Sequence, residues 1–313
     1  MSLKRSLINI AKLPLKDVKE IFSSFDTVLT DCDGVIWSSA DVIKGAKEAL
    51  DLIRGKGKEL FYYSNNSTRS REMFKSSITK FGFHCKNEDI ISTTFLTAYY
   101  LKSINFNKKA YVIGSIGLCK ELELVGIKHT SVGPDVLNIK ESIYEYVDSF
   151  QPDPEIGAVV IGYDIHISLP KLIKASSYLN RPDVLFVATN TDQSYPLTRK
   201  DVVLPAVGSI VAAIQAVDNR KPFIIGKPET YALEWLRKEV HVEAKRTLMI
   251  GDRLNTDILF GTRCGFQTLL VLTGVTKLED VEKLLKSKTK EDKDLIPDFY
   301  IESIGHLVNI LNS

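Results

Sequence analysis

The stretch Val28-Leu29-Thr30-Asp31-Cys32-Asp33-Gly34 is the most informative part of this 313-residue chain. A short apolar run ends there abruptly in a carboxylate. Three further runs share the pattern: Leu60–Tyr63 ends at Ser64, Phe223–Gly226 at Lys227, and Leu248–Gly251 at Asp252. Short, continuous apolar runs are typical of strands that are buried on both faces of a parallel sheet. The pattern therefore predicts four such strands, each followed at once by a polar side chain.

Helical periodicity separates these strands. Ala46, Ala49, Leu50 and Ile53 repeat at the spacing of an amphipathic helix. Segments 69–80, 229–240 and 254–263 also have a helical pattern, and a last short strand is expected near 299–301. Alternating strands and helices predict a doubly wound, Rossmann-like α/β fold with a parallel sheet. Ligands bind such sheets beyond the carboxyl ends of the strands, so the four terminating residues should share one edge.

A second set of elements interrupts this core. Strands are predicted over 110–113, 158–161 and 184–187, and helices over 115–124 and 168–180. We interpret this part as an α/β insertion that divides the core into two sequence segments. The expected organisation is a first core segment over 1–104, an α/β insertion over 105–220 and a second core segment over 221–313.

The composition excludes several classes of protein. Hydrophobic residues make up 44% and charged residues 26%, the balance of an ordinary globular protein. A net charge of +2 gives no electrostatic reason to expect nucleic acid or a membrane surface as partner. No apolar run reaches the roughly 18 residues of a membrane helix. The basic segment 1–13 is either a transit peptide or a short leader before a helix.

The cysteines indicate the compartment. The chain has four, and they form no CxxC pair; they are Cys32, Cys85, Cys119 and Cys264. We expect free thiols in a reducing environment, and hence a cytoplasmic protein.

Two acidic clusters are candidates for chemistry. A turn at Gly34 would let Asp31 and Asp33 both face the site, so that one acts as nucleophile and the other as acid/base. Asp252 and Asp257 lie in the second cluster, and acids at the ends of neighbouring strands can share Mg²⁺. The alternatives are a solvated Asp-x-Asp-Gly turn and a helix N-terminus with capping acids.

Two further groups complete the set. Ser64, Asn65 and Asn66 follow a strand and precede a helix, where a hydroxyl and backbone N–H groups can cradle a phosphate. Lys227 offers a point charge for a transferring phosphoryl group. Each group alone has an ordinary explanation, an N-cap cluster or a solvated lysine. Together they form the set of parts that phosphoryl transfer requires.

These residues resemble the four motifs of the haloacid dehalogenase superfamily of phosphatases. The motifs occur in order as Asp31-x-Asp33-Gly34-Val35, Ser64-Asn65-Asn66-Ser67, Lys227-Pro228, and Gly251-Asp252 through Asp257. The insertion between the second and third motifs resembles the large α/β cap of the subgroup that contains 4-nitrophenylphosphatase, phosphoglycolate phosphatase and pyridoxal phosphatase. Cap segments 161–164 and 188–192 and the tail 297–300 are similar to that subgroup too.

The resemblance implies a role for each residue. Asp31 is the nucleophile, and Asp33 is the acid/base. Mg²⁺ is held by Asp31, the backbone carbonyl of Asp33, and Asp252. Ser64, Asn65 and Asn66 bind the phosphate with Lys227, Asp257 orients Lys227 or a metal-bound water, and Gly34 and Trp37 belong to the loop after the nucleophile.

The substrate is less defined. Tyr195 stands in the cap loop where pyridoxal phosphatases of the subgroup are expected to have histidine, and Val207 occupies a cap turn that often has a smaller residue. We therefore expect a Mg²⁺-dependent phosphatase of small phosphorylated metabolites, of the phosphoglycolate or 4-nitrophenyl phosphate type. Pyridoxal phosphate and phosphoproteins remain alternative substrates. The resemblance also leaves open a homodimer formed through the cap.

Overall fold

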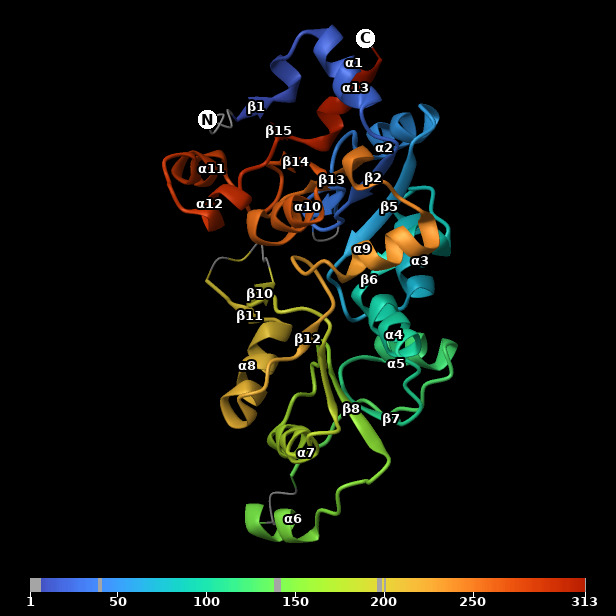
Figure 1. The fold of residues 1–313 in the computed structure, drawn as a ribbon, viewed down its shortest axis with the longest axis vertical. Coiled ribbons are helices and arrows are strands. Elements are labelled where there is room, and N and C mark those ends of the chain that lie inside the picture. Colours follow the sequence, from blue (N-terminus) through green and yellow to red (C-terminus); the bar gives the residue numbers. More distant parts are fainter. Residues whose placement is uncertain (1–6, 39–40, 138–141, 196–198, 200, 313) are drawn as a thin grey trace. The chain divides into compact units, whose positions relative to one another are not determined.

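The computed structural model describes residues 7–38, 41–137, 142–195, 199 and 201–312. Its helices and strands fall into two compact units (Figure 1). The first unit consists of Met1–Ser64, Lys75–Ile91 and Lys227–Ser313, and the second of Asn65–Phe74 and Ser92–Gly226. The predicted boundaries at 105 and 220 differ from these, because the second unit also takes in 65–74, 92–104 and 221–226.

A parallel sheet forms the core of the first unit. Among the described residues it has seven strands in the order β1-β15-β14-β13-β2-β5-β6. Their bounds are β1 (Ile8–Asn9), β15 (Phe299–Ile301), β14 (Gln267–Val271), β13 (Thr247–Gly251), β2 (Thr27–Thr30), β5 (Glu59–Ser64) and β6 (Ile90–Ser92). The pairs from β1 across to β5 are all parallel. Thr30 lies opposite both Ile250 and Tyr62, so β2, β13 and β5 end at the same edge.

Helices flank this sheet, as the alternating pattern predicts (Figure 1). The helices are α1 (Leu15–Ser23), α2 (Ala46–Gly55), α9 (Tyr231–Trp235), α10 (Leu259–Cys264), α11 (Leu278–Leu285), α12 (Lys290–Asp294) and α13 (Leu307–Leu311). Helix α3 (Arg71–Lys80) has residues in both units. In α2 the four buried residues are those whose spacing predicts the helix. A π-helical turn, η5 (Leu254–Ile258), precedes α10 and contains the buried Asp257. Such turns are frequent at functional sites.

The second unit has its own parallel sheet, in the order β12-β9-β8-β7. The strands are β7 (Lys109–Ile113), β8 (Ile156–Ile161), β9 (Leu185–Ala188) and β12 (Phe223–Ile224). The helices are α4 (Thr93–Ser103), α5 (Ile116–Leu124), α6 (Ile143–Ser149), α7 (Leu169–Leu179) and α8 (Val207–Asp218). Tyr178 of α7 and Val211 and Ile214 of α8 pack with strand residues in one buried cluster. The α/β class predicted for this part of the chain is confirmed.

One predicted strand of the core belongs elsewhere. The run Phe223–Gly226 was expected to be a core strand, but Phe223 and Ile224 form β12, which pairs in parallel with β9. Ile225 and Gly226 continue the pairing through hydrogen bonds to the carbonyls of Ala188 and Thr189. The prediction was wrong because an apolar run shows that a strand is buried and does not specify the sheet that buries it.

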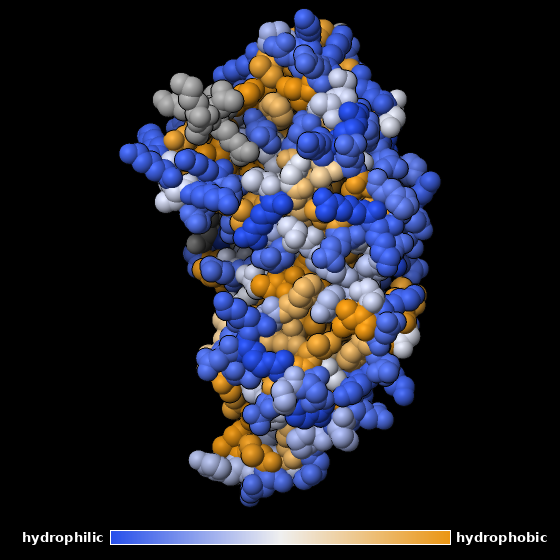
Figure 2. Space-filling model, in the orientation of Figure 1, coloured by the Kyte–Doolittle hydropathy of each residue, from blue (hydrophilic) through white to orange (hydrophobic). Residues whose placement is uncertain are grey.

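Helix α4 was not predicted. Every residue from Thr93 to Ala98 is buried, so the segment has no polar face to produce an amphipathic pattern. In the described ranges, no helix combines the length and the hydrophobicity that a bilayer span requires. Figure 2 shows a surface on which hydrophilic residues cover most of the visible face, with hydrophobic patches between them.

Candidate active site

The loop after β2 turns sharply at Gly34. Asp31 is still tied to the sheet, because its N–H donates to the carbonyl oxygen of Ile250 at 2.8 Å. Gly34 has a φ of +82°, and a Cβ atom there would lie 2.7 Å from Oδ2 of Asp252. Only glycine satisfies both the backbone conformation and the space. The predicted turn is confirmed, and it brings this loop against the second acidic cluster.

Lys227 lies at the centre of the site in the first unit, and its side chain is 2% exposed. Its Nζ is 2.8 Å from Oδ1 of Asp31 and 2.7 Å from Oδ1 of Asp257. It also donates to the backbone carbonyl of Tyr63 at 2.9 Å. A buried ammonium requires partners of this kind, since an unpaired charge in the interior is costly. The structure therefore brings together three residues that are far apart in the sequence.

The site has more carboxyl groups than lysines, and the crowding of these carboxyl groups affects their pKa values. Burial raises the pKa of the Asp31 carboxyl well above its usual range, against the opposing effect of Lys227. Burial and the carboxylate of Asp257 raise the pKa of Asp252 to about 7. For Lys227, burial alone would lower the pKa, but Asp257 and Asp31 raise it above the ordinary value. The site thus has a surplus of acidic groups that an additional cation would balance.

Three carboxylates of the site are close enough to hold a cation. Oxygens of Asp31, Asp252 and Asp257 lie within 4.8 Å of one another. Oδ1 of Asp252 is buried and has no hydrogen-bond partner among the described residues, which suits a metal ligand. Asp257 is engaged otherwise, since Oδ1 faces Lys227 and Oδ2 accepts the N–H groups of Asp252 and Arg253. Asp31 and Asp252 are therefore the better pair for a hard cation such as Mg²⁺.

Asp33, the predicted acid/base, is exposed and lies on the same loop. Its Oδ1 accepts a hydrogen bond of 2.8 Å from the indole N–H of Trp37. The sequence pattern placed Trp37 in this loop without indicating that contact, because no spacing rule for loops relates the two side chains.

The Ser64-Asn65-Asn66 motif is divided between the units. Ser64 is the buried last residue of β5, whereas Asn65 begins the second unit. The carbonyl of Asn65 accepts hydrogen bonds from Thr93 at 3.1 Å and Asn190 at 2.8 Å. Oδ1 of Asn66 accepts from the N–H and hydroxyl of Thr68, at 2.8 and 2.7 Å. That local turn fits the alternative explanation of Asn66 as part of an N-cap cluster, and phosphate binding by these residues stays a prediction.

Tyr195 lies in the second unit, in a short hairpin made of β10 (Ser194–Tyr195) and β11 (Leu204–Pro205). Its ring is half-buried and packs edge-on against Tyr163, with centroids 5.0 Å apart. Residues 196–198, which follow Tyr195 in the sequence, lie outside the described residues. The predicted contact between Tyr195 and the substrate therefore stays a prediction.

The loop after β14 is a part of the site that the sequence analysis missed. The N–H of Val275 donates to Oδ2 of Asp252 at 2.7 Å, and the Thr273 hydroxyl donates to the carbonyl of Gly34 at 2.6 Å. A Cβ at Gly274 would lie only 1.9 Å from Oδ2 of Asp252. The signal was available, because Thr273-Gly274 follows another apolar run and should emerge at the same edge of the sheet.

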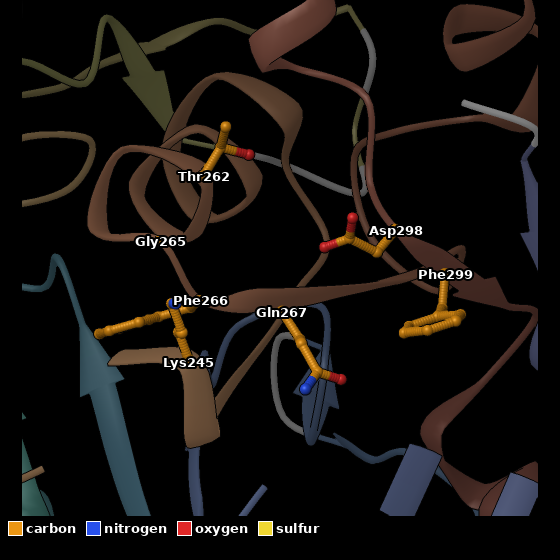
Figure 3. Close-up of a pocket in the computed structure, with 7 residues that line it drawn as sticks. All are labelled: Lys245, Thr262, Gly265, Phe266, Gln267, Asp298 and Phe299. Carbon is orange, nitrogen blue, oxygen red and sulfur yellow. The ribbon is translucent and has the colours of Figure 1, made fainter. Parts of the chain in front are cut away.

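A pocket of about 440 Å³ lies elsewhere in the first unit (Figure 3). Its lining includes Lys245, Gln267 and Asp298, which stand just before or at the start of β13, β14 and β15. The acidic cluster follows the carboxyl ends of strands, so this pocket belongs to the opposite edge of the sheet. Asp298 already accepts two hydrogen bonds from Thr268, and the pocket has no part in the site described above.

Comparison with known proteins places this geometry in a family. A family model described as haloacid dehalogenase-like hydrolase matches residues 28–128, and one described as HAD-hydrolase-like matches residues 224–306. Glycerol-3-phosphate phosphatase from Rattus norvegicus is 36% identical over 312 residues, which is 97% of this chain and 96% of the relative. Phosphoglycolate phosphatase 2 from Arabidopsis thaliana is 37% identical over 305 residues, 96% of this chain and 98% of the relative.

Comparison with solved structures leads to the same family. The p-nitrophenyl phosphatase from Archaeoglobus fulgidus superimposes with a TM-score of 0.76 at 27% identity, covering 91% of this chain and 99% of that one. The fold, the site and these matches define the class of the protein as phosphoric monoester hydrolase. Within that class, the chain belongs to the haloacid dehalogenase-like hydrolases, since relatives more than 30% identical cover nearly its whole length. The resemblance inferred from the four motifs is confirmed.

Proposed function

We propose that this protein is a Mg²⁺-dependent phosphatase that hydrolyses small phosphate monoesters through an aspartyl-phosphate on Asp31. The observation that supports this best is the buried ammonium of Lys227, 2.8 Å from Asp31 and 2.7 Å from Asp257. A fixed cation beside a carboxylate nucleophile can neutralise the oxygens of a phosphoryl group as it is attacked.

The first step transfers the phosphoryl group to the enzyme. A carboxylate oxygen of Asp31 forms a bond to phosphorus while the bond from phosphorus to the ester oxygen breaks. The electron pair of the broken bond stays on the ester oxygen, which takes the proton of the Asp33 carboxylic acid and leaves as an alcohol. Lys227 stabilises the negative charge on the phosphoryl oxygens throughout.

The second step releases phosphate. The Asp33 carboxylate takes a proton from water, and the water oxygen forms a bond to phosphorus. The bond from phosphorus to Asp31 breaks, and its electron pair returns to that carboxylate. Asp33 then carries a proton again, so the enzyme is ready for another ester.

We infer a resident Mg²⁺ ion, and the acidic cluster supports this inference. Asp31 and Asp252 would hold it, and the family resemblance adds the backbone carbonyl of Asp33. When bound, Mg²⁺ supplies positive charge that offsets the charge of the phosphoryl oxygens and of the crowded carboxylates. Oδ1 of Asp252, buried and without a hydrogen-bond partner among the described residues, supports this assignment.

The substrates proposed are small phosphate monoesters. The relatives named above are phosphatases of glycerol-3-phosphate and phosphoglycolate, which share a short, polar leaving alcohol. We propose esters of this type as substrates and 4-nitrophenyl phosphate as an artificial one. Pyridoxal phosphate and phosphoproteins are the alternatives that a substrate panel must test.

The experiment measures phosphate release from these esters with Mg²⁺ and with excess chelator, for the wild type, Asp31→Asn and Asp51→Asn. Asp31→Asn should lose about 10⁴-fold or more, because it removes the covalent route. Asp51, an exposed helical residue, serves as the control and its variant should keep wild-type activity. An Asp31→Asn activity within tenfold of wild type, or full activity in chelator, would refute the proposed function.

A further inference from the structure

The chain folds back on itself between Asp33 and Trp37. The N–H of Ile36 donates to the carbonyl of Cys32 at 3.0 Å, and the N–H of Gly34 donates to the carbonyl of Trp37 at 2.7 Å. This tight loop places the indole beside the Asp33 carboxylate, so that Nε1 donates to Oδ1 at 2.8 Å. The two side chains are thus linked both by the backbone and by their own hydrogen bond.

The Trp37 indole is fixed by packing, whereas the Asp33 carboxylate is not packed in the interior. Trp37 is 4% exposed, whereas Asp33 is exposed. The Trp37 ring packs against Phe81 at 5.4 Å and against Phe83 at 6.4 Å between centroids. Both phenylalanines come from the segment after α3, more than 40 residues further along the chain. A ring fixed on two sides by packing points its N–H in one direction.

We propose that Trp37 is a positioning residue that holds the Asp33 carboxyl group in the orientation needed for proton transfer to the leaving oxygen. This inference deepens the proposed function and rests on it. An exposed aspartate samples several rotamers, and restricting them is a way in which enzymes lower the entropy cost of reaching the reactive geometry. The indole N–H provides that restriction without supplying a proton itself, since an indole N–H is only a donor and is not acidic.

The proposal distinguishes Trp37 from a residue that only supports the fold. Proton transfer from Asp33 matters when the leaving oxygen is a strong base and matters little when it is a weak base. Phenyl phosphate and 4-nitrophenyl phosphate have similar shapes, but phenoxide is a much stronger base than 4-nitrophenoxide. Loss of positioning should therefore lower the rate of hydrolysis of phenyl phosphate selectively. A general loosening of the site should lower the rates for both esters.

The experiment measures kcat/KM with Mg²⁺ for both esters, because kcat/KM reports the step that expels the leaving group. Trp37→Phe keeps a ring against Phe81 and Phe83 and removes the N–H. It should lower kcat/KM about 10- to 100-fold for phenyl phosphate and less than about threefold for 4-nitrophenyl phosphate. Phe83→Leu, which weakens the support of the indole and retains its N–H, should show the same preference with a smaller loss.

Two controls complete the test. Trp235, the second tryptophan of the chain, packs edge-on against Phe61 in the first unit, and Trp235→Phe should change both values by one common factor. In an Asp33→Asn background, Trp37→Phe should cause no further loss, because a positioning residue acts only through the group it positions.

Three outcomes would overturn the proposal: equal losses on both esters, no loss on either, or an undiminished loss in the Asp33→Asn background. A wild type that releases phosphate from neither ester would overturn the proposed function as well.

Discussion

The side-chain nitrogen of Lys227 lies 2.8 Å from Oδ1 of Asp31, although 196 residues separate the two in the chain. Lys227 is in turn 2.7 Å from Asp257, and both Lys227 and Asp257 have side chains that are 2% exposed. The ion pair of Lys227 and Asp257 is thus shielded from water. Away from water, each charge is stabilised mainly by its charged neighbours. The consequences can be tested by removing the lysine.

Lys227→Met should reduce phosphatase activity at least about 100-fold, because the positive charge next to the phosphoryl oxygens is lost. It should also lower the free energy of unfolding by about 3–5 kcal/mol, because the carboxylates of Asp31 and Asp257 stay buried without their cation. Steady-state kinetics and urea unfolding measure the two effects. The exposed Lys286 provides the control, and Lys286→Met should change neither quantity. A Lys227→Met protein as stable as wild type would contradict a buried ion pair.

Gly274→Ala tests the close approach of the β14 loop to Asp252. A Cβ there would lie 1.9 Å from Oδ2 of Asp252, so the carboxylate or the loop must shift. We expect the Mg²⁺ concentration for half-maximal activity to rise about tenfold or more. Mg²⁺ requires near-ideal octahedral coordination, so it tolerates little displacement of a ligand. Titration of activity with Mg²⁺ after chelation measures this.

Gly55→Ala is the matched control for that variant. Nothing lies within 4 Å of a Cβ built at Gly55, which ends α2 with an ordinary φ. Its Mg²⁺ requirement should equal that of wild type. An unchanged Mg²⁺ requirement in Gly274→Ala would argue against Asp252 as a ligand.

Ca²⁺ should bind to the wild type and inhibit it, because its longer bonds misplace the attacking carboxylate.

The cysteines should be unreactive in the folded protein. All four are free and buried, as the absence of a pairing pattern predicts. Burial raises the pKa of Cys85, Cys119 and Cys264 to about 12. Alkylation by iodoacetamide at pH 8 should therefore be at least about 100-fold slower in the native state than in denaturant, because the thiolate is the reactive form. Mass spectrometry resolves each site, and rapid native labelling of these three would contradict their burial.

The raised thiol pKa values also make the stability of the protein depend on pH. The folded state holds each thiol proton more tightly than the unfolded state does, and this adds to the free energy of unfolding. The added free energy is fully present below the ordinary thiol pKa of about 8.5 and is lost as the pH rises from there towards 12.

Tyr195 tests the choice of substrate. Its hydroxyl sits on a larger, more apolar ring than the histidine expected in pyridoxal phosphatases, and that ring packs against Tyr163. We expect a higher kcat/KM for 2-phosphoglycolate than for pyridoxal 5′-phosphate, and a shift towards pyridoxal phosphate in Tyr195→His. A wild type that prefers pyridoxal phosphate would place the protein elsewhere in the subgroup. If the substitution changes neither value, selectivity resides in other cap residues.

Sequence reasoning was most successful where a local pattern carries a physical constraint. The runs before Asp31, Ser64 and Asp252 are core strands, and the helix buried through Ala46, Ala49, Leu50 and Ile53 is present. Parallel strands end at a common edge, so polar residues that directly follow them must emerge together. The positive φ at Gly34 was predictable for a similar reason, since few residues other than glycine turn a chain so tightly between two acids.

The tertiary structure decided what depends on partners distant in the chain. The run Phe223–Gly226 has the same apolar pattern as a core strand, yet β9 pairs with it in the second sheet. The first six residues of helix α4, Thr93–Ala98, are all buried, so this stretch of the chain has no amphipathic signal. The contacts from Trp37 to Asp33 and from Val275 to Asp252 depend on how loops are folded.

The sequence by itself thus determined the α/β class, the edge that carries the polar residues and the kind of chemistry they suit. It did so because burial and backbone conformation constrain residue type at each position. Only the tertiary structure decided which sheet receives a strand, which carboxylate pairs with Lys227, and which side chain orients Asp33. Those choices depend on packing and charge balance among residues brought together by folding, and no local pattern records them.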